Sequence, residues 1–382
     1  MGWTHTDISL ATSAPSALTA PCAFVFDALG TQHVDFVGQD GHIYDLLEDD
    51  TGWSFNDLTT AASAPLVFSG VAVKANNPAG YAFSSQATLH VFFVGDDCHV
   101  HELWSDGSGW FHKDLTSAVG APLAAVVPPS AYVFGAQGTQ HVDYIGEDGH
   151  IHELWWDETG WHYSDLIVAT GAPLPAPVPP SAYAFDAQGS QHVDYVGQDG
   201  HIHELTWVSG TWSHSDLTAL SGAPSTSRQT SLASYVFLLQ GTRHVDYVAQ
   251  DGGSIHELTY DGSGWHHDNL SVSAGAAGAT GGGVLCAYPF DSQSTRHVAY
   301  TDGMGHINEL WWDKNGWHYN DLTRDTSAPS ADQGTPAAYV FVSQRSQHIF
   351  YIGIADSDIH ELRWRSGPVV PSPVLPFSPV LE

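Results

Sequence analysis

The chain has 382 residues, with 10 Lys or Arg against 42 Asp or Glu, so its formal net charge is -32. Nucleic acids and anionic membranes need a basic surface, so this balance argues against both as partners. The chain has no apolar run long enough to span a membrane. It also has no secretory signal pattern at its start, so we expect a cytoplasmic location or non-classical secretion.

Two residue types add to this picture. The 24 histidines predict sensitivity to mildly acidic pH. The three cysteines, Cys22, Cys98 and Cys286, are odd in number and far apart, which does not fit a disulfide framework.

The chain begins with "MGWTHTDIS", and close relatives of this stretch recur six times downstream. Each later copy ends a repeated unit of about 51 residues. The units begin at Ala23, Gly80, Ala131, Ala182, Ser234, Ala287 and Ala338.

Each unit holds four short segments, with the forms "AYVF", "HVDYV", "HIHELWW" and "GWHYSDL". They are rich in β-branched and aromatic residues and are bounded by Gly, Asp, Asn or Ser, which predicts four strands. Between the second and third segments of the unit at Ala182, a turn over Gln198 and Asp199 with Gly200 at positive φ predicts a three-residue hairpin loop.

Repeated four-stranded antiparallel units predict an all-β fold, a seven-bladed β-propeller. The seventh unit lacks its fourth segment, and the N-terminal stretch is a fourth segment without the other three. We therefore expect Trp3 to Ser9 to complete the last blade and close the ring, since an open ring would expose a strand edge.

The predicted boundaries follow from the repeats. We expect one propeller domain over 1–367 and a Pro-rich tail over 368–382, with insertions near 60–79 and 274–283. The blades are predicted near 23–60, 80–117, 131–168, 182–219, 234–272, 287–324 and 338–367 plus 1–9.

The predicted loop fixes a register. It pairs Asp143 with Glu153 and His141 with Trp155, which places His, Asp, Glu and an aromatic on one face of the blade, whereas a two-residue loop would swap the faces. Two interpretations stay open. The repeated His and Glu are either a buried structural hydrogen-bonded pair, or part of a sugar site in which aromatic rings contact C–H faces and polar groups hold hydroxyls. The tryptophan of "GW" is expected in the core and the Asp of "DL" at a turn or cap.

Stretches such as "QHVDYVGQDGHIHEL" and "HIHELWWDETGWHYSDL" resemble the repeat of the Photorhabdus-type seven-bladed propeller lectins and, more distantly, the Aleuria-type fucose lectins. The resemblance covers nearly the whole chain. It implies multivalent sites between adjacent blades for fucose or related or O-methylated sugars, and homo-oligomers. We expect no cofactor and no catalysis.

The resemblance also implies site residues. Where the fungal lectins have an Arg, this chain has His in every unit; their Glu is present except at Asp45. The candidate sugar-binding residues are His90, Glu102, Trp104, His141, Glu153, Trp155, Trp161, His192, Glu204, Trp212, His244, Glu257, Trp265, His297, Glu309, Trp311, Trp317, His348 and Glu361. Because the units are unequal, we expect fewer than seven working sites, the best of them on blades three and four and their neighbours.

Three alternatives remain. His150 and His152 lie on one side of a strand and could bind zinc, but a metal needs three or four ligands. A glycosidase needs two distinct carboxylates, whereas these are repeated almost uniformly. A propeller scaffold for protein–protein interaction is the main alternative function.

Overall fold

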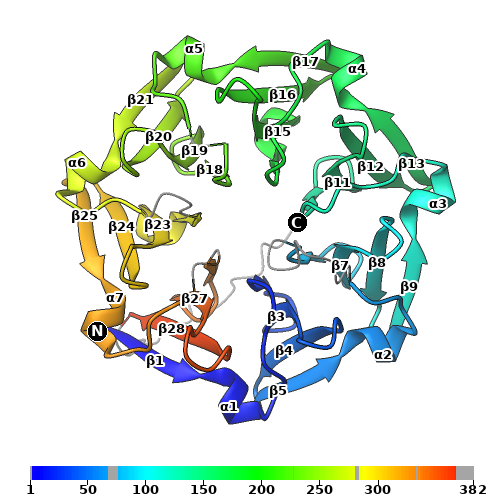
Figure 1. Cartoon of the computed structure of the whole chain (residues 1–382), viewed down its shortest axis with the longest axis horizontal. Coiled ribbons are helices and arrows are strands. Elements are labelled where there is room, and N and C mark those ends of the chain that lie inside the picture. The colour runs from blue at the N-terminus through cyan, green and yellow to red at the C-terminus, as the bar shows by residue number, and fades with distance from the viewer. Residues whose placement is uncertain are drawn as a thin grey trace, which may run out of the picture.

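The computed structural model describes residues 2–67, 76–226, 228–279, 284–332, 334 and 336–366. Within these residues the strands form seven sheets, each of four antiparallel strands, arranged as blades around a common axis (Figure 1). The first strand of each blade lies nearest the axis and the fourth lies at the rim. The predicted seven-bladed propeller is confirmed.

Blades one to three contain β2 (Cys22–Phe26), β3 (Thr31–Val37), β4 (Ile43–Asp49), β5 (Gly52–Asp57), β6 (Ala79–Phe83), β7 (Thr88–Val94), β8 (Val100–Ser105), β9 (Trp110–Asp114), β10 (Ser130–Phe134), β11 (Thr139–Ile145), β12 (Ile151–Asp157) and β13 (Gly160–Asp165). Blades four and five contain β14 (Ser181–Phe185), β15 (Ser190–Val196), β16 (Ile202–Val208), β17 (Thr211–Asp216), β18 (Ala233–Phe237), β19 (Thr242–Val248), β20 (Ile255–Tyr260) and β21 (Trp265–Asn269). Blades six and seven contain β22 (Leu285–Phe290), β23 (Thr295–Thr301), β24 (Ile307–Asp313), β25 (Gly316–Asp321), β26 (Ala337–Phe341), β27 (Ser346–Ile352), β28 (Ile359–Arg365) and β1 (Gly2–Asp7).

The predicted hairpin register is confirmed. In blade three His141 pairs with Trp155 and Asp143 with Glu153, as the three-residue loop requires. In blade four the Gly200 amide donates to the Gly197 carbonyl oxygen at 2.9 Å, and Gly200 has a φ of 84°. A side chain at that φ is strained, so glycine suits the position.

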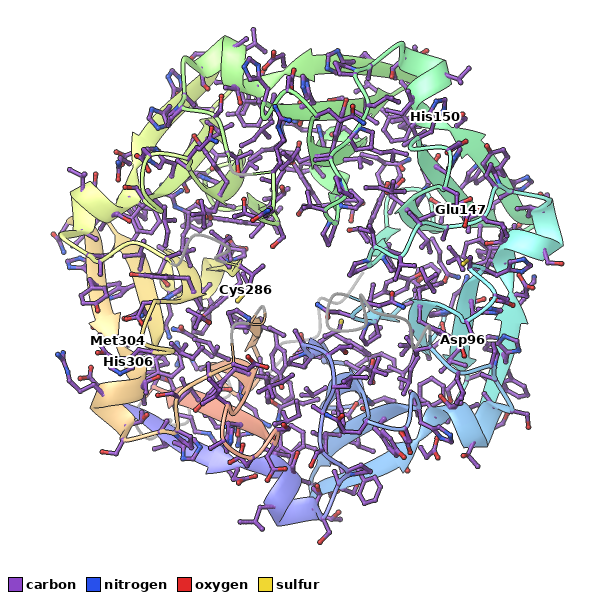
Figure 2. The ribbon with its side chains drawn as sticks, viewed as in Figure 1. Asp96, Glu147, His150, Cys286, Met304 and His306 are labelled. Carbon is purple, nitrogen blue, oxygen red and sulfur yellow. The ribbon has the colours of Figure 1, made fainter. Side chains whose placement is uncertain are left out.

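The hydrophobic core is divided among the spaces between blades. Each of seven apolar clusters joins two neighbouring blades. Between blades three and four, for example, Ile151 and Leu166 pack with Val193 and Tyr195. Figure 2 shows side chains filling these spaces, with Cys286 near the axis of the ring. The three cysteines are free thiols.

A short helix follows the fourth strand of every blade, which the sequence analysis did not predict. The helices are α1 (Ile8–Thr12), α2 (Leu58–Ala62), α3 (Leu115–Val119), α4 (Leu166–Thr170), α5 (Leu217–Ser221), α6 (Leu270–Ala274) and α7 (Leu322–Thr326). Five residues are too few to show helical periodicity. The Asp of "DL" is the N-cap, as expected: the Asp165 carboxylate accepts from the Val168 amide at 2.9 Å. Among the described residues no helix is long and apolar enough to span a membrane.

The N-terminal strand closes the ring, as predicted. β1 pairs with β28, with Trp3 opposite Trp364 and His5 opposite Leu362 (Figure 1). The Ser9 hydroxyl oxygen, at the start of α1, accepts from the Ile359 amide at 2.9 Å. The fourth strand therefore satisfies the outer edge of β28, which would otherwise be open. The predicted Pro-rich tail over 368–382 and parts of both predicted insertions lie outside the described residues.

Ring closure can be tested within α1. Ile8 is fully buried in the cluster between blades seven and one, whereas Leu10 is 73% exposed. We expect Ile8→Ala to lower the free energy of unfolding by about 2–5 kcal/mol because it leaves a cavity. Leu10→Ala, the matched control, should change it by less than about 0.5 kcal/mol. Denaturant unfolding measures both, and equal effects would contradict a closing role for this segment.

A second buried feature is a carboxyl group on the second strand of four blades. Asp143 and its equivalents Asp35, Asp194 and Asp246 are 0–1% exposed. Within the part of the chain that the structure describes, neither Asp143 oxygen has a hydrogen-bond partner. Burial and then the charge of Glu153 raise the pKa of Asp143 well above its usual range.

This raised pKa has a direct consequence for stability. A carboxyl group whose pKa is higher in the folded than in the unfolded state favours folding while it is protonated. This contribution to the free energy of unfolding is complete below the unfolded pKa of 3.8 and is lost as pH rises toward the folded pKa. Asp143→Asn cannot ionise, so we expect it to exceed the wild type in stability at neutral and alkaline pH by about 1–3 kcal/mol. That advantage should vanish in acid. Unfolding curves at several pH values measure the difference, and a difference that is flat with pH would contradict the assignment.

Candidate functional site

A histidine and a carboxylate are hydrogen-bonded on one face of every blade. In blade three, His141 Nδ1 lies 2.8 Å from Glu153 Oε1 and His141 Nε2 lies 2.7 Å from Thr139 Oγ1. Because the carboxylate only accepts, Nδ1 carries the proton and Nε2 accepts from the hydroxyl. His141 and Glu153 are both buried. Both ring nitrogens of His141 thus form hydrogen bonds within its own blade, and the bond from Nδ1 holds the orientation of the Glu153 carboxylate.

The same pair recurs around the ring. The other Nδ1 to carboxylate distances are 2.8 Å for His90–Glu102, 2.9 Å for His192–Glu204, His244–Glu257 and His297–Glu309, 2.7 Å for His348–Glu361, and 3.2 Å for His33–Asp45. The predicted structural pair is therefore present, and the histidines orient the carboxylates.

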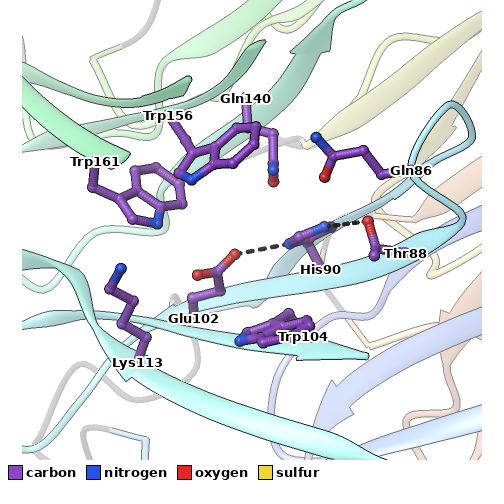
Figure 3. A pocket seen from close by; sticks show the side chains of 9 residues that line it. All are labelled: Gln86, Thr88, His90, Glu102, Trp104, Lys113, Gln140, Trp156 and Trp161. Carbon is purple, nitrogen blue, oxygen red and sulfur yellow. Dashed lines mark hydrogen bonds and ion pairs between the residues drawn. The ribbon is translucent and has the colours of Figure 1, made fainter. Parts of the chain in front are cut away.

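Three of the cavities that described residues line between blades combine the histidine-bearing face of one blade with the opposite face of the next. We call the blade face that carries this histidine the histidine face. The cavity between blades two and three has a volume of about 320 Å³ (Figure 3). It is lined by Gln86, Thr88, His90, Glu102, Trp104 and Lys113 of blade two and by Gln140, Trp156 and Trp161 of blade three.

The two other cavities repeat this arrangement. The cavity between blades three and four, of about 250 Å³, is lined by Gln137, His141, Glu153, Trp155, Ser164, Gln191, Trp207, Gly210 and Trp212. The cavity between blades six and seven, of about 530 Å³, is lined by Gly2, Trp3, Gln293, Thr295, His297, Glu309, Trp311, Asn320, Asp325, Gln347 and Trp364. We refer to these three as the open cavities.

Aromatic rings reach each open cavity from both blades. On the histidine face of blade three, Trp155 stacks on His162 with ring centroids 4.0 Å apart. Trp311 stacks on His318 at 4.1 Å, and Trp104 on Phe111 at 4.6 Å. One ring face of each tryptophan is therefore covered by its own blade. The neighbouring blade adds two more tryptophans, which Figure 3 shows as Trp156 and Trp161 facing Glu102.

A glutamine of the neighbouring blade also lines each open cavity. Tyr81 donates its hydroxyl hydrogen to Gln140 Oε1 at 2.8 Å across the two blades, and Tyr132 donates to Gln191 at 2.8 Å. Tyr288 donates to Gln347 at 3.2 Å. With its oxygen engaged, each glutamine retains an amide nitrogen as a donor.

At three other interfaces the predicted residues meet an arginine. Arg243 contacts His192 and Glu204, and Arg296 contacts His244 and Glu257. Arg363 contacts His348 and Glu361 and forms an ion pair with Glu48 of blade one. Trp265 and Trp317 lie under Arg243 and Arg296, respectively.

The sequence analysis missed residues that come from the neighbouring blade. These are Trp3, Gln140, Trp156, Gln191, Trp207, Gln347 and Trp364. The available signal was the alternation along each strand, which places these side chains on the face opposite the histidine. Blade-to-blade stacking then brings the two faces together.

The structure adds acidic neighbours to the predicted histidine pair. His150 Nδ1 lies 2.8 Å from Asp165 Oδ2, and His152 Nε2 lies 3.0 Å from Asp148 Oδ1. His152, Asp148 and Asp165 have donor atoms within 4.8 Å of one another. Asp165 also caps α4, so these groups already have structural hydrogen bonds at the rim of the blade.

The tyrosine–glutamine bond can be tested by comparison with the interface between blades one and two. There Phe24 and Leu89 occupy the tyrosine and glutamine positions. We expect Tyr132→Phe or Gln191→Leu alone to cost about 1–3 kcal/mol, since each leaves a buried polar group without its partner. The double variant should recover part of this cost. A double-mutant cycle by denaturant unfolding measures the coupling, and additive costs would contradict it.

Comparison with known proteins supports the fold. No protein-family model and no curated protein matches the chain. Among solved structures, the BP39L lectin from Burkholderia pseudomallei is 17% identical over 92% of this chain and 96% of that chain, with a TM-score of 0.70. AofleA from Arthrobotrys oligospora is 14% identical over 84% and 90%, with a TM-score of 0.55. The six-bladed Aleuria aurantia lectin is 19% identical over 80% and 94%, with a TM-score of 0.50. These likenesses match the expected resemblance to propeller lectins at the level of the fold.

Proposed function

We propose that the protein is a multivalent carbohydrate-binding lectin and that its open cavities are the sugar sites. The observation that carries the proposal is the composition of these cavities. Each joins an oriented glutamate, a glutamine amide and tryptophan rings from two blades. A sugar ring needs such a combination, because it has apolar C–H faces and hydroxyls that require hydrogen-bond partners.

The cavity volumes suit a small ligand. They run from about 250 to about 530 Å³, near the lower end of small-molecule sites. In each site the histidine holds Glu Oε1, so Oε2 is the oxygen left for a sugar hydroxyl. Around Glu309, Asn320 also donates to Oε2 at 2.8 Å, which distinguishes this site from the others.

We further propose fucose or a related or O-methylated sugar as the ligand. SapL1 binds α-methyl fucoside in its solved structure, and the Aleuria aurantia lectin has a fucose recognition mode. A methyl group on the sugar would lie against the tryptophans. Lys113 at the cavity between blades two and three has Ser164 and Asn320 as counterparts, so the three sites differ in their polar rim.

Binding without hydrolysis agrees with the carboxylates present. Canonical glycoside hydrolysis uses two carboxyl groups that flank the bond. Among the described residues, Glu102 and Glu153 are the single carboxylates lining their respective cavities, whereas Glu309 and Asp325 both line the cavity between blades six and seven. Several weak sites on one rigid ring would gain avidity for surfaces that display many glycans.

The test is sugar binding by the folded protein, with Glu153→Gln as the site variant. We expect titration calorimetry with methyl α-L-fucoside, or with the best monosaccharide from a glycan array, to show saturable binding. Glu153→Gln should weaken binding at its own site by about 10- to 100-fold, since a charged acceptor is lost. The matched control is Asp45→Asn in blade one, whose interface has Leu47 and Leu89 in place of Trp and Gln.

Two results would contradict the proposal. One is a folded protein that binds no glycan and no monosaccharide; tight capture of a protein partner would then favour the scaffold function. The other is an equal effect of Glu153→Gln and Asp45→Asn on sugar affinity, because that would place the ligand elsewhere.

A further inference from the structure

We propose that Arg243 and Arg296 are built-in occupants of two further sugar sites, and that an arginine directly before the second-strand histidine closes the interface. The inference rests on the proposed function and concerns the interfaces between blades four and five and between blades five and six. It accounts for why the repeated His and Glu of these two interfaces contact an arginine instead of lining one of the open cavities.

Arg243 projects from β19 of blade five into the histidine face of blade four. Its Nη1 lies 2.7 Å from His192 Nδ1 and forms an ion pair with Glu204. Its guanidinium carbon lies 4.4 Å from the ring centroid of Tyr260 and 5.1 Å from that of Trp265. Arg243 is only 6% exposed.

Arg296 repeats this arrangement one interface further on. Its Nη1 lies 2.7 Å from His244 Nδ1 and forms an ion pair with Glu257. Its guanidinium carbon lies 4.8 Å from the ring centroid of Trp312 and 5.2 Å from that of Trp317. It is likewise 6% exposed.

Each guanidinium thus uses the two features proposed to hold a sugar, the carboxylate and the aromatic faces. A planar guanidinium pairs with a carboxylate and stacks on aromatic rings, so it satisfies both at once. Burial would raise the pKa of Glu204, but the His192 hydrogen bond and the Arg243 charge outweigh it and lower that pKa. A sugar entering here would have to separate a buried ion pair, which is strongly unfavourable.

Two positions change together between the open and closed interfaces. At the three open cavities, the neighbouring blade presents a glutamine and the third strand of the first blade has a tryptophan on its histidine face. These pairs are Trp104 with Gln140, Trp155 with Gln191 and Trp311 with Gln347. Where the neighbouring blade presents an arginine, the third strand has a threonine, as in Thr206 with Arg243 and Thr259 with Arg296. At the interface between blades seven and one, Gln32 of blade one meets a third strand of blade seven that has Arg363 at this position.

The threonine takes part in the closed arrangement. Thr259 Oγ1 lies 3.2 Å from His244 Nδ1, the nitrogen that Arg296 also contacts. The tyrosine of the first strand changes its partner too: Tyr235 donates to Glu257 at 3.3 Å because arginine has no acceptor to offer. The closed interface is therefore held by an ion pair and hydrogen bonds in place of a ligand, while the Tyr183 hydroxyl and the Nε atoms of both arginines have no hydrogen-bond partner among the described residues.

The experiment exchanges the two states. Arg243→Gln should add a sugar site per chain, with weaker affinity because the tryptophan is missing. Adding Thr206→Trp should raise the affinity of that new site at least several-fold. The reverse exchange, Gln191→Arg with Trp155→Thr, should remove one site. Titration calorimetry with methyl α-L-fucoside, or with the monosaccharide selected on the glycan array, gives the number of sites.

Controls separate this inference from loss of folding and from the proposed function. Arg324→Gln removes a charge from a side chain that is 71% exposed and should leave the number of sites unchanged. Arg296→Gln offers a second opening variant, and thermal unfolding verifies that each variant folds. A wild type that binds no sugar overturns the proposed function and this inference together. A wild type that binds sugar, with no site gained by either folded arginine variant, overturns this inference alone.

Discussion

A buried carboxylate on the histidine face of each blade is the constraint on which the inter-blade interfaces depend. Propeller blades pack face to face, so a charged group on one face must be satisfied by what the next blade presents. The histidine meets one oxygen in every blade. At five interfaces the neighbour presents either a glutamine beside a cavity or an arginine that fills the space. Between blades seven and one the arginine is Arg363 of blade seven itself, and between blades one and two the position holds Leu89.

This constraint unites the structural and functional interpretations of the repeated histidine. Both nitrogens of His141 bond within its own blade, so the residue does not need a ligand to be satisfied. The same bonds hold Glu153 in a fixed orientation at the cavity wall. The histidine–glutamate hydrogen bond within one blade thus positions the glutamate carboxylate as an acceptor for a group that lies between the blades.

Closure of the ring has a similar double role. β1 completes the last blade and protects the edge of β28, and its residue Trp3 also lines the cavity between blades six and seven. Since β1 and β28 meet there, that cavity exists only in the closed ring. It is also the largest of the three open cavities, at about 530 Å³.

The sequence by itself determined the fold to the level of register. The repeat length, the strand patterns and the unmatched first and last segments predicted seven blades and their closure. The loop around Gly200 predicted which residues share a face, because the side-chain period of a strand is two. These are local signals, carried by residues close together in the chain. The one-turn helices were not predicted, because five residues are too few to show a helical periodicity.

Only the tertiary structure decided which interfaces are open. His192 and Glu204 look equivalent to His141 and Glu153 in the repeat, yet Arg243 from the next blade lies against the first pair and a cavity against the second. Such a site combines faces of two blades that are about 50 residues apart. Which side chain fills the space between them depends on its length and charge in the packed ring, and no single repeat contains that information.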